Sequence, residues 1–277
     1  MSLVGPGNLG SALALTLVSA GYEVKYIAVR PSRSGVLHAR ALAKRTKAQI
    51  VTLGKQALDS NIVWLAVPDD AIADVSRTLA ASQDWKGRLV FHSSGALTSE
   101  ELAALRKQGA KVASVHPMMT FVRGAAPEMA GVSFALEGDA VAVRTARAIV
   151  ESLGANPFVI KKQNKVLYHV FGSFASPLVI ALMASMEQVG KAAGIPQRDV
   201  KSIILPLLRR TWGNYSTKGP PSAFSGPLVR GDVATVRKHL AELKKLPEAR
   251  EVYLALARAS LKLLPVANRK AIARELR

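Results

Sequence analysis

The stretch LVGPGNLG, residues 3–10, decides the fold of this chain. Its glycines have the spacing G-x-G-x-x-G, and an apolar helical pattern follows over residues 11–20. In a strand–turn–helix of this kind the first glycine allows a tight turn, the second lets a pyrophosphate approach the backbone, and the third lets the helix pack on the strand. The helix N-terminus also offers free N–H groups to phosphates. The stretch therefore predicts a dinucleotide site in which the pyrophosphate is held by Gly5, Gly7, Asn8, Leu9 and Gly10. The alternative is a glycine-rich turn in some other α/β protein.

The residues after the second predicted strand, Val24–Val29, indicate which nucleotide binds. An NAD site usually has Asp or Glu about 20 residues past the glycines, but Arg30 stands there and no acid occurs between Glu23 and Asp59. A guanidinium matches the oxygens of a 2′-phosphate. The sequence thus favours NADP(H) over NAD(H), with the 2′-phosphate held by Arg30, Ser32 and Arg33. The alternative is that these arginines are solvated surface charges.

Length and composition limit the classes of protein to which the chain can belong. The chain has 277 residues and no cysteine, which excludes disulfides and thiolate chemistry and agrees with a reducing cytoplasm. We see no signal segment, and the longest apolar run, Phe171–Met183, is short for a membrane span and contains Gly172 and Pro177. The expectation is a soluble cytoplasmic protein without a membrane partner. Only four residues precede Gly5, which leaves open whether the first strand begins upstream of Met1.

The net charge of +19 raises the question of nucleic acid. The basic residues are spread along the chain and the aromatic content is only 5%, so no basic patch interleaved with aromatics is evident. We therefore expect a basic surface that attracts an anionic cofactor and substrate, and no specific nucleic-acid partner. A nucleic-acid-associated protein is the alternative.

Strands and helices alternate over residues 1–116, which predicts a doubly wound, mostly parallel Rossmann sheet. Another α/β stretch covers 132–160, and only helical patterns follow. We expect two domains, an NADP-binding domain over 1–160 and an all-α domain over 161–277. The predicted strands are 3–4, 24–29, 50–53, 62–67, 89–91, 112–115, 132–136 and 157–160. The predicted helices are 9–20, 35–45, 71–81, 99–108, 140–153, 163–193, 197–216, 232–245, 248–263 and 266–276.

A polar stripe lies on the first long C-terminal helix. Lys165, His169, Ser173 and Ser176 share one helical face in an otherwise apolar segment. Such a stripe needs polar partners or a wet cleft, and Pro177 predicts a kink beside it. Lys165 and His169 are therefore candidate proton donors at the cleft of the nucleotide domain, against the alternative of a surface lysine and an interior histidine.

Several segments in series resemble the family of Rossmann-like proteins with a helical domain of unknown function, DUF2520. They are GPGNLG (5–10), WLAVPDDAI (64–72), FHSSGAL (91–97), SVHPMMTF (114–121), LYHVFGSFAS (167–176) and SGPLVRGD (225–232). The family is distantly similar to pyrroline-5-carboxylate reductases, prephenate dehydrogenases and β-hydroxyacid dehydrogenases. The resemblance implies an NADP-binding Rossmann domain and a helical domain, similar to the C-terminal domain of 6-phosphogluconate dehydrogenase, that commonly dimerises.

The resemblance also implies site residues. His116 looks like the histidine of the His-Pro-Met segment in prephenate dehydrogenases. Lys165 looks like the lysine of the Lys-x-x-x-Asn pair of β-hydroxyacid dehydrogenases, with His169 in the place of the asparagine, a departure that weakens the transfer of their mechanism. The remaining expected cofactor contacts are Val67, Pro68 and Asp69 at the nicotinamide ribose, and Ser93, Ser94 and Gly95 near the nicotinamide. Each has a structural alternative, such as a strand end or a helix cap. No metal site is suggested, because the five histidines show no ligand spacing.

These features predict an NADP(H)-dependent oxidoreductase that transfers hydride to or from a small carbonyl or imine compound, expected to bear a carboxylate. Lys165, His169 and His116 remain open as the proton donor. One alternative is a non-catalytic NADP(H)-binding or sensing protein. Another is a deazaflavin-linked NADP oxidoreductase.

Overall fold

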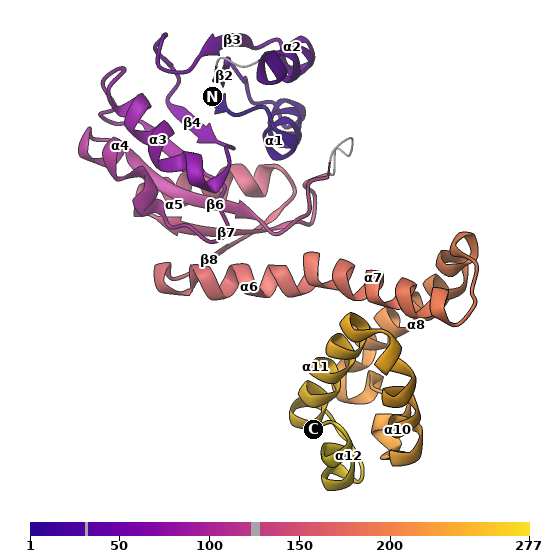
Figure 1. Cartoon of the computed structure of the whole chain (residues 1–277). Coiled ribbons are helices and arrows are strands. Elements are labelled where there is room, and N and C mark those ends of the chain that lie inside the picture. Colours follow the sequence, from indigo (N-terminus) through magenta and orange to yellow (C-terminus); the bar gives the residue numbers. More distant parts are fainter. Residues whose placement is uncertain (31–32, 123–127) are drawn as a thin grey trace. The chain divides into compact units, whose positions relative to one another are not determined.

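The computed structural model describes residues 1–30, 33–122 and 128–277, with the side chains of 33 and 34 excepted. The chain forms two compact units, Met1–Ser173 and Phe174–Arg277, which are described separately. The first unit is an α/β sheet domain and the second is helical (Figure 1). The expected fold class, a Rossmann-type sheet followed by an all-α region, is confirmed.

The strands of the first unit form one sheet in the order β3-β2-β1-β4-β5-β6-β7-β8. The described strands are β1 Ser2–Val4, β2 Tyr26–Val29, β3 Gln49–Thr52, β4 Ile62–Leu65, β5 Leu89–His92, β6 Lys111–Pro117, β7 Ser133–Gly138 and β8 Asn156–Val159. Leu3 in β1 pairs with Ile27 on one side and with Trp64 on the other. The strand order therefore reverses beside β1, which is the point where sheets of this type bind ligands at the carboxyl ends of their strands.

The two faces of the sheet carry different helices, and residue alternation along the strands assigns them. The helices of this unit are α1 Asn8–Ser19, α2 Arg33–Thr46, α3 Asp69–Ala80, η1 Ser99–Leu102, α4 Ala103–Lys107, α5 Ala140–Ser152 and η2 Lys162–Asn164, with α6 Lys165–Ala175 beginning in it. Leu3 and Trp64 pack with α1, α2 and α5, whereas Val4 and Val63 pack with α3, η1 and α4. Because side chains of a strand alternate between faces, the central strands β1, β2, β4, β5 and β6 contribute to both cores.

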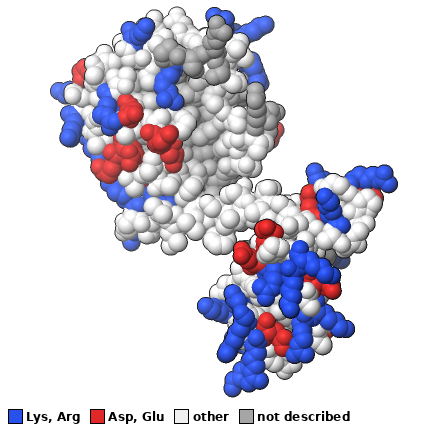
Figure 2. Space-filling model, viewed as in Figure 1, with Lys and Arg blue, Asp and Glu red and all other residues white. Residues whose placement is uncertain are grey.

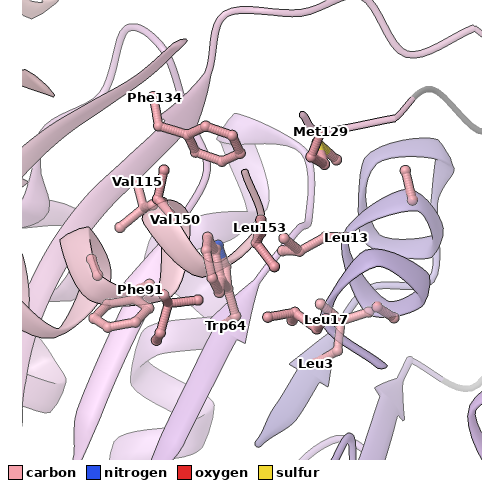
Figure 3. Packing of buried hydrophobic residues seen from close by; sticks show 14 of the residues in the cluster. Leu3, Leu13, Leu17, Trp64, Phe91, Val115, Met129, Phe134, Val150 and Leu153 are labelled. Carbon is pink, nitrogen blue, oxygen red and sulfur yellow. The ribbon is translucent and has the colours of Figure 1, made fainter. Parts of the chain in front are cut away.

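The larger core is built around aromatic side chains (Figure 3). Trp64 and Phe91 meet edge to face, with ring centroids 5.3 Å apart, and Phe134 is fully buried nearby in the same cluster. Burial of one such side chain contributes about 1.5–3 kcal/mol. This core supports the strands whose carboxyl ends carry the polar residues described below.

The second unit is a set of helices around a small core. They are α7 Pro177–Ala192, α8 Gln197–Ala223, α9 Pro227–Arg230, α10 Val233–Glu242, η3 Leu243–Lys245, α11 Pro247–Leu263 and α12 Arg269–Glu275. Val236, Leu254 and Ile272 are buried together. Gly219 interrupts α8 with non-helical torsions (φ 72°), just past the end of the helix predicted over 197–216.

Two details differ from the sequence expectations. The predicted helix 99–108 begins as the 3₁₀ turn η1, with Thr98 accepting from the Glu100 N–H, before α4 starts at Ala103. The strand predicted at 132–136 is β7, which pairs antiparallel with β6. The hydrophobic pattern of a strand does not encode the direction of its neighbour.

The expectation about apolar runs also needs correction. The helical stretch Lys162–Ala192 is long and apolar enough to cross a membrane by length and composition, with a mean hydropathy of 1.8. The backbone leaves the helical conformation at Ser176 and a new helix starts at Pro177, as the proline predicted. The sequence estimate stopped at Phe171 and missed the apolar residues before it, which lie beside Lys165 and His169 on the helix.

Candidate functional site

The glycine turn between β1 and α1 has the geometry that the motif requires. Gly5 has φ +96°, and a Cβ there would lie 2.6 Å from the Ala66 carbonyl oxygen. A Cβ on Gly10 would lie 2.0 Å from the Gly5 carbonyl oxygen, whereas one on Gly7 would have no atom within 4 Å. Gly5 and Gly10 are therefore needed for packing. Gly7, which caps α1, leaves open space at the helix N-terminus where a phosphate group fits.

A cavity of about 220 Å³ opens beside this turn. Its lining includes five residues that the sequence assigned to a cofactor: Gly5, Gly7, Arg30, Val67 and Pro68. The sequence did not single out His38, Leu53, Ala66 and Val75, which also line it. His38 lies on α2, a few residues after Arg30, and this closeness in sequence could have indicated that it lines the cavity.

Among the described residues, Asn8, Leu9 and Gly10 do not line this cavity. The Asn8 side chain donates to the Phe121 carbonyl at 3.1 Å. Leu9 and Gly10 lie in the first turn of α1. Ser32 is outside the described residues, and Arg33 is placed only as the first residue of α2.

Lys165 lies in the first unit and has no exposed surface. Its Nζ donates to the Ser94 carbonyl at 2.8 Å and to Ser114 Oγ at 2.6 Å. Burial lowers the pKa of Lys165 to about 8, and the nearby carboxylates of Glu137 and Asp69 oppose that shift. The ammonium group is therefore fixed at the carboxyl ends of β5 and β6 with a proton that it can release near neutral pH.

Ser94 connects Lys165 with the strand ends around it. Its hydroxyl donates to Asp69 Oδ2 at 2.7 Å, and its N–H donates to Nδ1 of His92. His92 Nε2 lies 3.0 Å from the Thr98 carbonyl, and burial lowers the pKa of His92 to about 4. A neutral His92 therefore accepts at one nitrogen and donates at the other, which holds the turn after β5.

Ser93 has a structural partner. Its hydroxyl accepts a hydrogen bond of 2.8 Å from the indole N–H of Trp64. A buried indole N–H needs such an acceptor. The contact agrees with the alternative of a strand-end residue for Ser93.

Two histidines flank Gly95. A Cβ on Gly95 would lie 2.7 Å from His169 Cδ2 and 2.8 Å from His116 Nε2. His169 is exposed and His116 is half-buried. Burial and then the charge of Lys165 lower the pKa of His116 to about 3. The structure thus brings together Lys165, His116, His169 and the 94–95 turn.

The sequence reasoning missed two residues of this cluster. The Tyr168 hydroxyl lies 2.8 Å from Nδ1 of His116. The spacing of three residues from Lys165 was a usable signal, but the search followed charged and polar residues at a spacing of four. Glu137 is buried and opposes Ser114 in the β6–β7 register, where its carboxylate accepts from the Ser99 N–H and hydroxyl at 2.8 Å. Glu137 was missed because the sequence did not predict that β7 pairs antiparallel with β6.

The rest of the polar stripe is not part of the cluster. The Ser173 hydroxyl bonds back to the His169 carbonyl within α6, a common arrangement for helical serines. Ser176 lies between α6 and α7.

Comparison with protein-family models identifies the class of protein. Residues 1–117 match the model of a Rossmann-like domain. Residues 132–260 match the model of a domain of unknown function, DUF2520. The chain therefore carries a Rossmann-like domain and a DUF2520 domain, as the sequence motifs indicated.

Solved structures of similar fold cover nearly the whole chain. A candidate NADP oxidoreductase from Bacteroides fragilis is 20% identical with a TM-score of 0.77, over 93% of this chain and 96% of its own. A protein from Thermotoga maritima is 25% identical with a TM-score of 0.72, over 100% and 99%. An imine reductase from Myxococcus stipitatus, solved with NADP⁺, is 17% identical with a TM-score of 0.71, over 100% and 99%. The search of curated proteins found no match.

Proposed function

We propose that this protein is an NADP(H)-dependent oxidoreductase that reduces or oxidises a small carbonyl or imine compound. The observation that carries the proposal is the pairing of an open glycine turn with a buried lysine. Gly7 leaves room for a pyrophosphate at the N-terminus of α1, and Lys165 is held at the carboxyl ends of β5 and β6 of the same sheet. The imine reductase and the candidate NADP oxidoreductase of similar fold support this class of reaction.

The residues fit a dinucleotide as follows. The pyrophosphate lies against Gly5, Gly7 and the first turn of α1, where Gly7 has no side chain in the way. Arg30, on the wall of the cavity, would hold the 2′-phosphate, and the sequence assigns Ser32 and Arg33 to the same group. Val67, Pro68 and Asp69 would hold the nicotinamide ribose, and Ser93, Ser94 and Gly95 would face the nicotinamide. When bound, the cofactor supplies or accepts the hydride.

The side chains of the protein would supply or accept the proton that accompanies hydride transfer. Lys165, whose pKa is lowered to about 8, exchanges a proton close to neutral pH and polarises the site through its charge. His116 and His169 stand beside Gly95, within reach of a substrate on that turn. A carboxylate on the substrate agrees with the net charge of +19.

The test of cofactor choice is Arg30→Ala. We expect NADPH affinity to fall about 10- to 100-fold, because charge-assisted hydrogen bonds to the 2′-phosphate are lost, while NADH affinity stays within about twofold. Fluorescence titration of both nucleotides measures this. Arg40→Ala is the matched control, since Arg40 is an exposed arginine of α2 and is not among the lining residues described for the cavity. Equal losses in both variants would show a general effect of net charge, and no NADPH binding by the wild type would end the proposal.

We further propose that the protein is a homodimer formed through its apolar helices. Leu167 and Phe171 on α6 are 72% and 66% exposed, and Ile180 on α7 is 64% exposed. Figure 2 shows few charged side chains over α6 and α7 on the face in view. Soluble monomers rarely expose large apolar patches, and a second copy would cover the exposed apolar side chains of each helix.

Light scattering after size-exclusion chromatography tests the dimer. The wild type is expected at twice the chain mass of 29.5 kDa, and Ile180→Asp is expected to shift to monomer, because a buried charge is costly. Leu263→Asp, at a residue that is 77% exposed on α11, serves as control and stays dimeric. A monomeric wild type, or one recovered only with lipid or detergent, would contradict the proposal.

A further inference from the structure

We propose that Tyr168 is a positioning residue that fixes the proton of the His116 imidazole on Nε2, the nitrogen that faces Gly95. The effect on substrate recognition rests on the proposed function, whereas the tautomer itself follows from the hydrogen bonds of the folded protein. It makes His116 a neutral hydrogen-bond donor toward the substrate site.

The two ring nitrogens of His116 have different surroundings. Nδ1 lies 2.8 Å from the Tyr168 hydroxyl, and the rings stand edge to face with centroids 5.5 Å apart. Nε2 is directed toward Gly95, where a Cβ would lie 2.8 Å away. Within the described part of the chain, no protein group is hydrogen-bonded to Nε2.

The need of the Tyr168 hydroxyl for a hydrogen-bond partner decides which of the two neutral tautomers His116 adopts. Tyr168 is only 8% exposed, and Nδ1 is the one hydrogen-bond partner of its hydroxyl among the residues that the structure describes. A buried hydroxyl that can donate to an acceptor is favoured over one that leaves its proton unpaired. If Nδ1 carried the proton, the phenol would accept and its own O–H would have no partner. The phenol therefore donates, and the imidazole proton is on Nε2.

Both side chains are uncharged over the whole neutral pH range. Burial raises the pKa of Tyr168 to about 12. Burial lowers the pKa of His116 to about 3, helped by Lys165, His169 and His92. The pair thus remains a neutral phenol on a neutral imidazole, with one N–H directed away from the tyrosine.

This arrangement selects the substrate atom. A neutral Nε2–H donates to a lone pair, so it recognises a carbonyl oxygen or a neutral imine nitrogen. A protonated iminium has no lone pair at nitrogen and gains nothing from this contact. Lys165 does not compete as the direct hydrogen-bond donor to the substrate atom, because it has no exposed surface in this structure and donates to Ser94 and Ser114. Its part is the proton exchange and the charge described above.

The experiment is ¹⁵N NMR of the histidine side chains in the nucleotide-free, full-length protein, with His116→Asn to assign the signals. The wild type is expected to show His116 protonated on Nε2 and hydrogen-bonded at Nδ1. In Tyr168→Phe the Nδ1 resonance is expected to shift downfield as its hydrogen bond is lost. His239 and Tyr253 form a similar pair, 3.2 Å apart and edge to face, so Tyr253→Phe is the matched control and moves only His239.

A His116 proton on Nδ1 in the wild type would overturn the inference, as would a His116 spectrum that Tyr168→Phe leaves unchanged. Thermal unfolding of Tyr168→Phe checks that the variant retains its fold. If the variant does not fold, the wild-type spectrum alone decides which tautomer is present. NADPH titration separates the two proposals: Tyr168→Phe binds NADPH as the wild type does. Loss of nucleotide binding in the wild type itself would contradict the proposed function while the NMR result stands.

Discussion

Gly10→Ala is expected to prevent the sheet domain from reaching its native fold. The added Cβ would lie 2.0 Å from the Gly5 carbonyl oxygen and 3.2 Å from the Ala66 Cβ. The turn cannot yield, because the Gly5 N–H is bonded to the Ala28 carbonyl in the middle of the sheet. Overpacking of a core costs about 1–3 kcal/mol, and a Cβ this close to a backbone oxygen exceeds that range. Urea unfolding followed by circular dichroism measures the loss.

Gly7→Ala is the matched control for this prediction. A Cβ on Gly7 meets nothing within 4 Å, so the free energy of unfolding should fall by no more than about 1 kcal/mol, the difference between Gly and Ala at the N-cap of α1. Its NADPH affinity should nevertheless fall at least about tenfold, because the methyl group occupies the space of the pyrophosphate. A Gly7→Ala protein that binds NADPH normally would show that the phosphates lie elsewhere. A stable Gly10→Ala protein would show that helix and turn separate more easily than the geometry indicates.

Lys165→Met is expected to raise the free energy of unfolding at pH 7 by about 1–3 kcal/mol while turnover is lost. Replacing a buried charge by an apolar side chain of similar size often stabilises a protein. The polar groups left behind keep partners, since the Ser114 hydroxyl already donates to the Ser94 carbonyl at 3.2 Å. The lysine is then retained for its chemistry at a cost in stability.

The pH dependence of stability tests the same residue. The pKa of Lys165 is lowered from 10.5 to about 8 in the folded protein, so between these values the unfolded chain binds more protons. The free energy of unfolding due to this group therefore rises with pH across that window, by about 3 kcal/mol in total. We expect this rise in the wild type and in the control Lys161→Met, whose lysine is exposed, but not in Lys165→Met.

Urea titrations at pH 7.5 and pH 10 compare the three proteins. If Lys165→Met lost stability at pH 7.5 and kept the pH-dependent rise of the wild type, the hydrogen bonds of Lys165 would outweigh the cost of its burial. Its role would then be to hold β5 and β6 to α6.

Local patterns in the sequence predicted most of the sheet domain. The glycine spacing marks a turn in which Gly5 has a positive φ and Gly10 has no room for a side chain, and the alternation of strand and helix patterns predicted the Rossmann order. Arg30 was found because it follows β2 directly, and the structure places it on the cavity wall. In each case the signal lies within a few residues of the feature, so neighbouring residues carry it.

Contacts between distant residues could not be predicted in this way. Glu137 reaches the lysine cluster because β7 pairs antiparallel with β6 and opposes Ser114, and no local pattern encodes that direction. Tyr168 read as one more apolar residue of an amphipathic helix until His116, 52 positions earlier, was found at its hydroxyl. Lys165 was recognised as a candidate, but its complete burial was not foreseen.

The Rossmann turn, the class of each element and the basic residue at the end of β2 could be predicted from local sequence alone. Backbone torsion and hydrophobic period are properties of neighbouring residues. Which polar side chains share the carboxyl edge of the sheet, and which of them can give up a proton, depends on how the chain folds in three dimensions. Protonation depends on burial and on charges from other strands, and these exist only once the chain has folded.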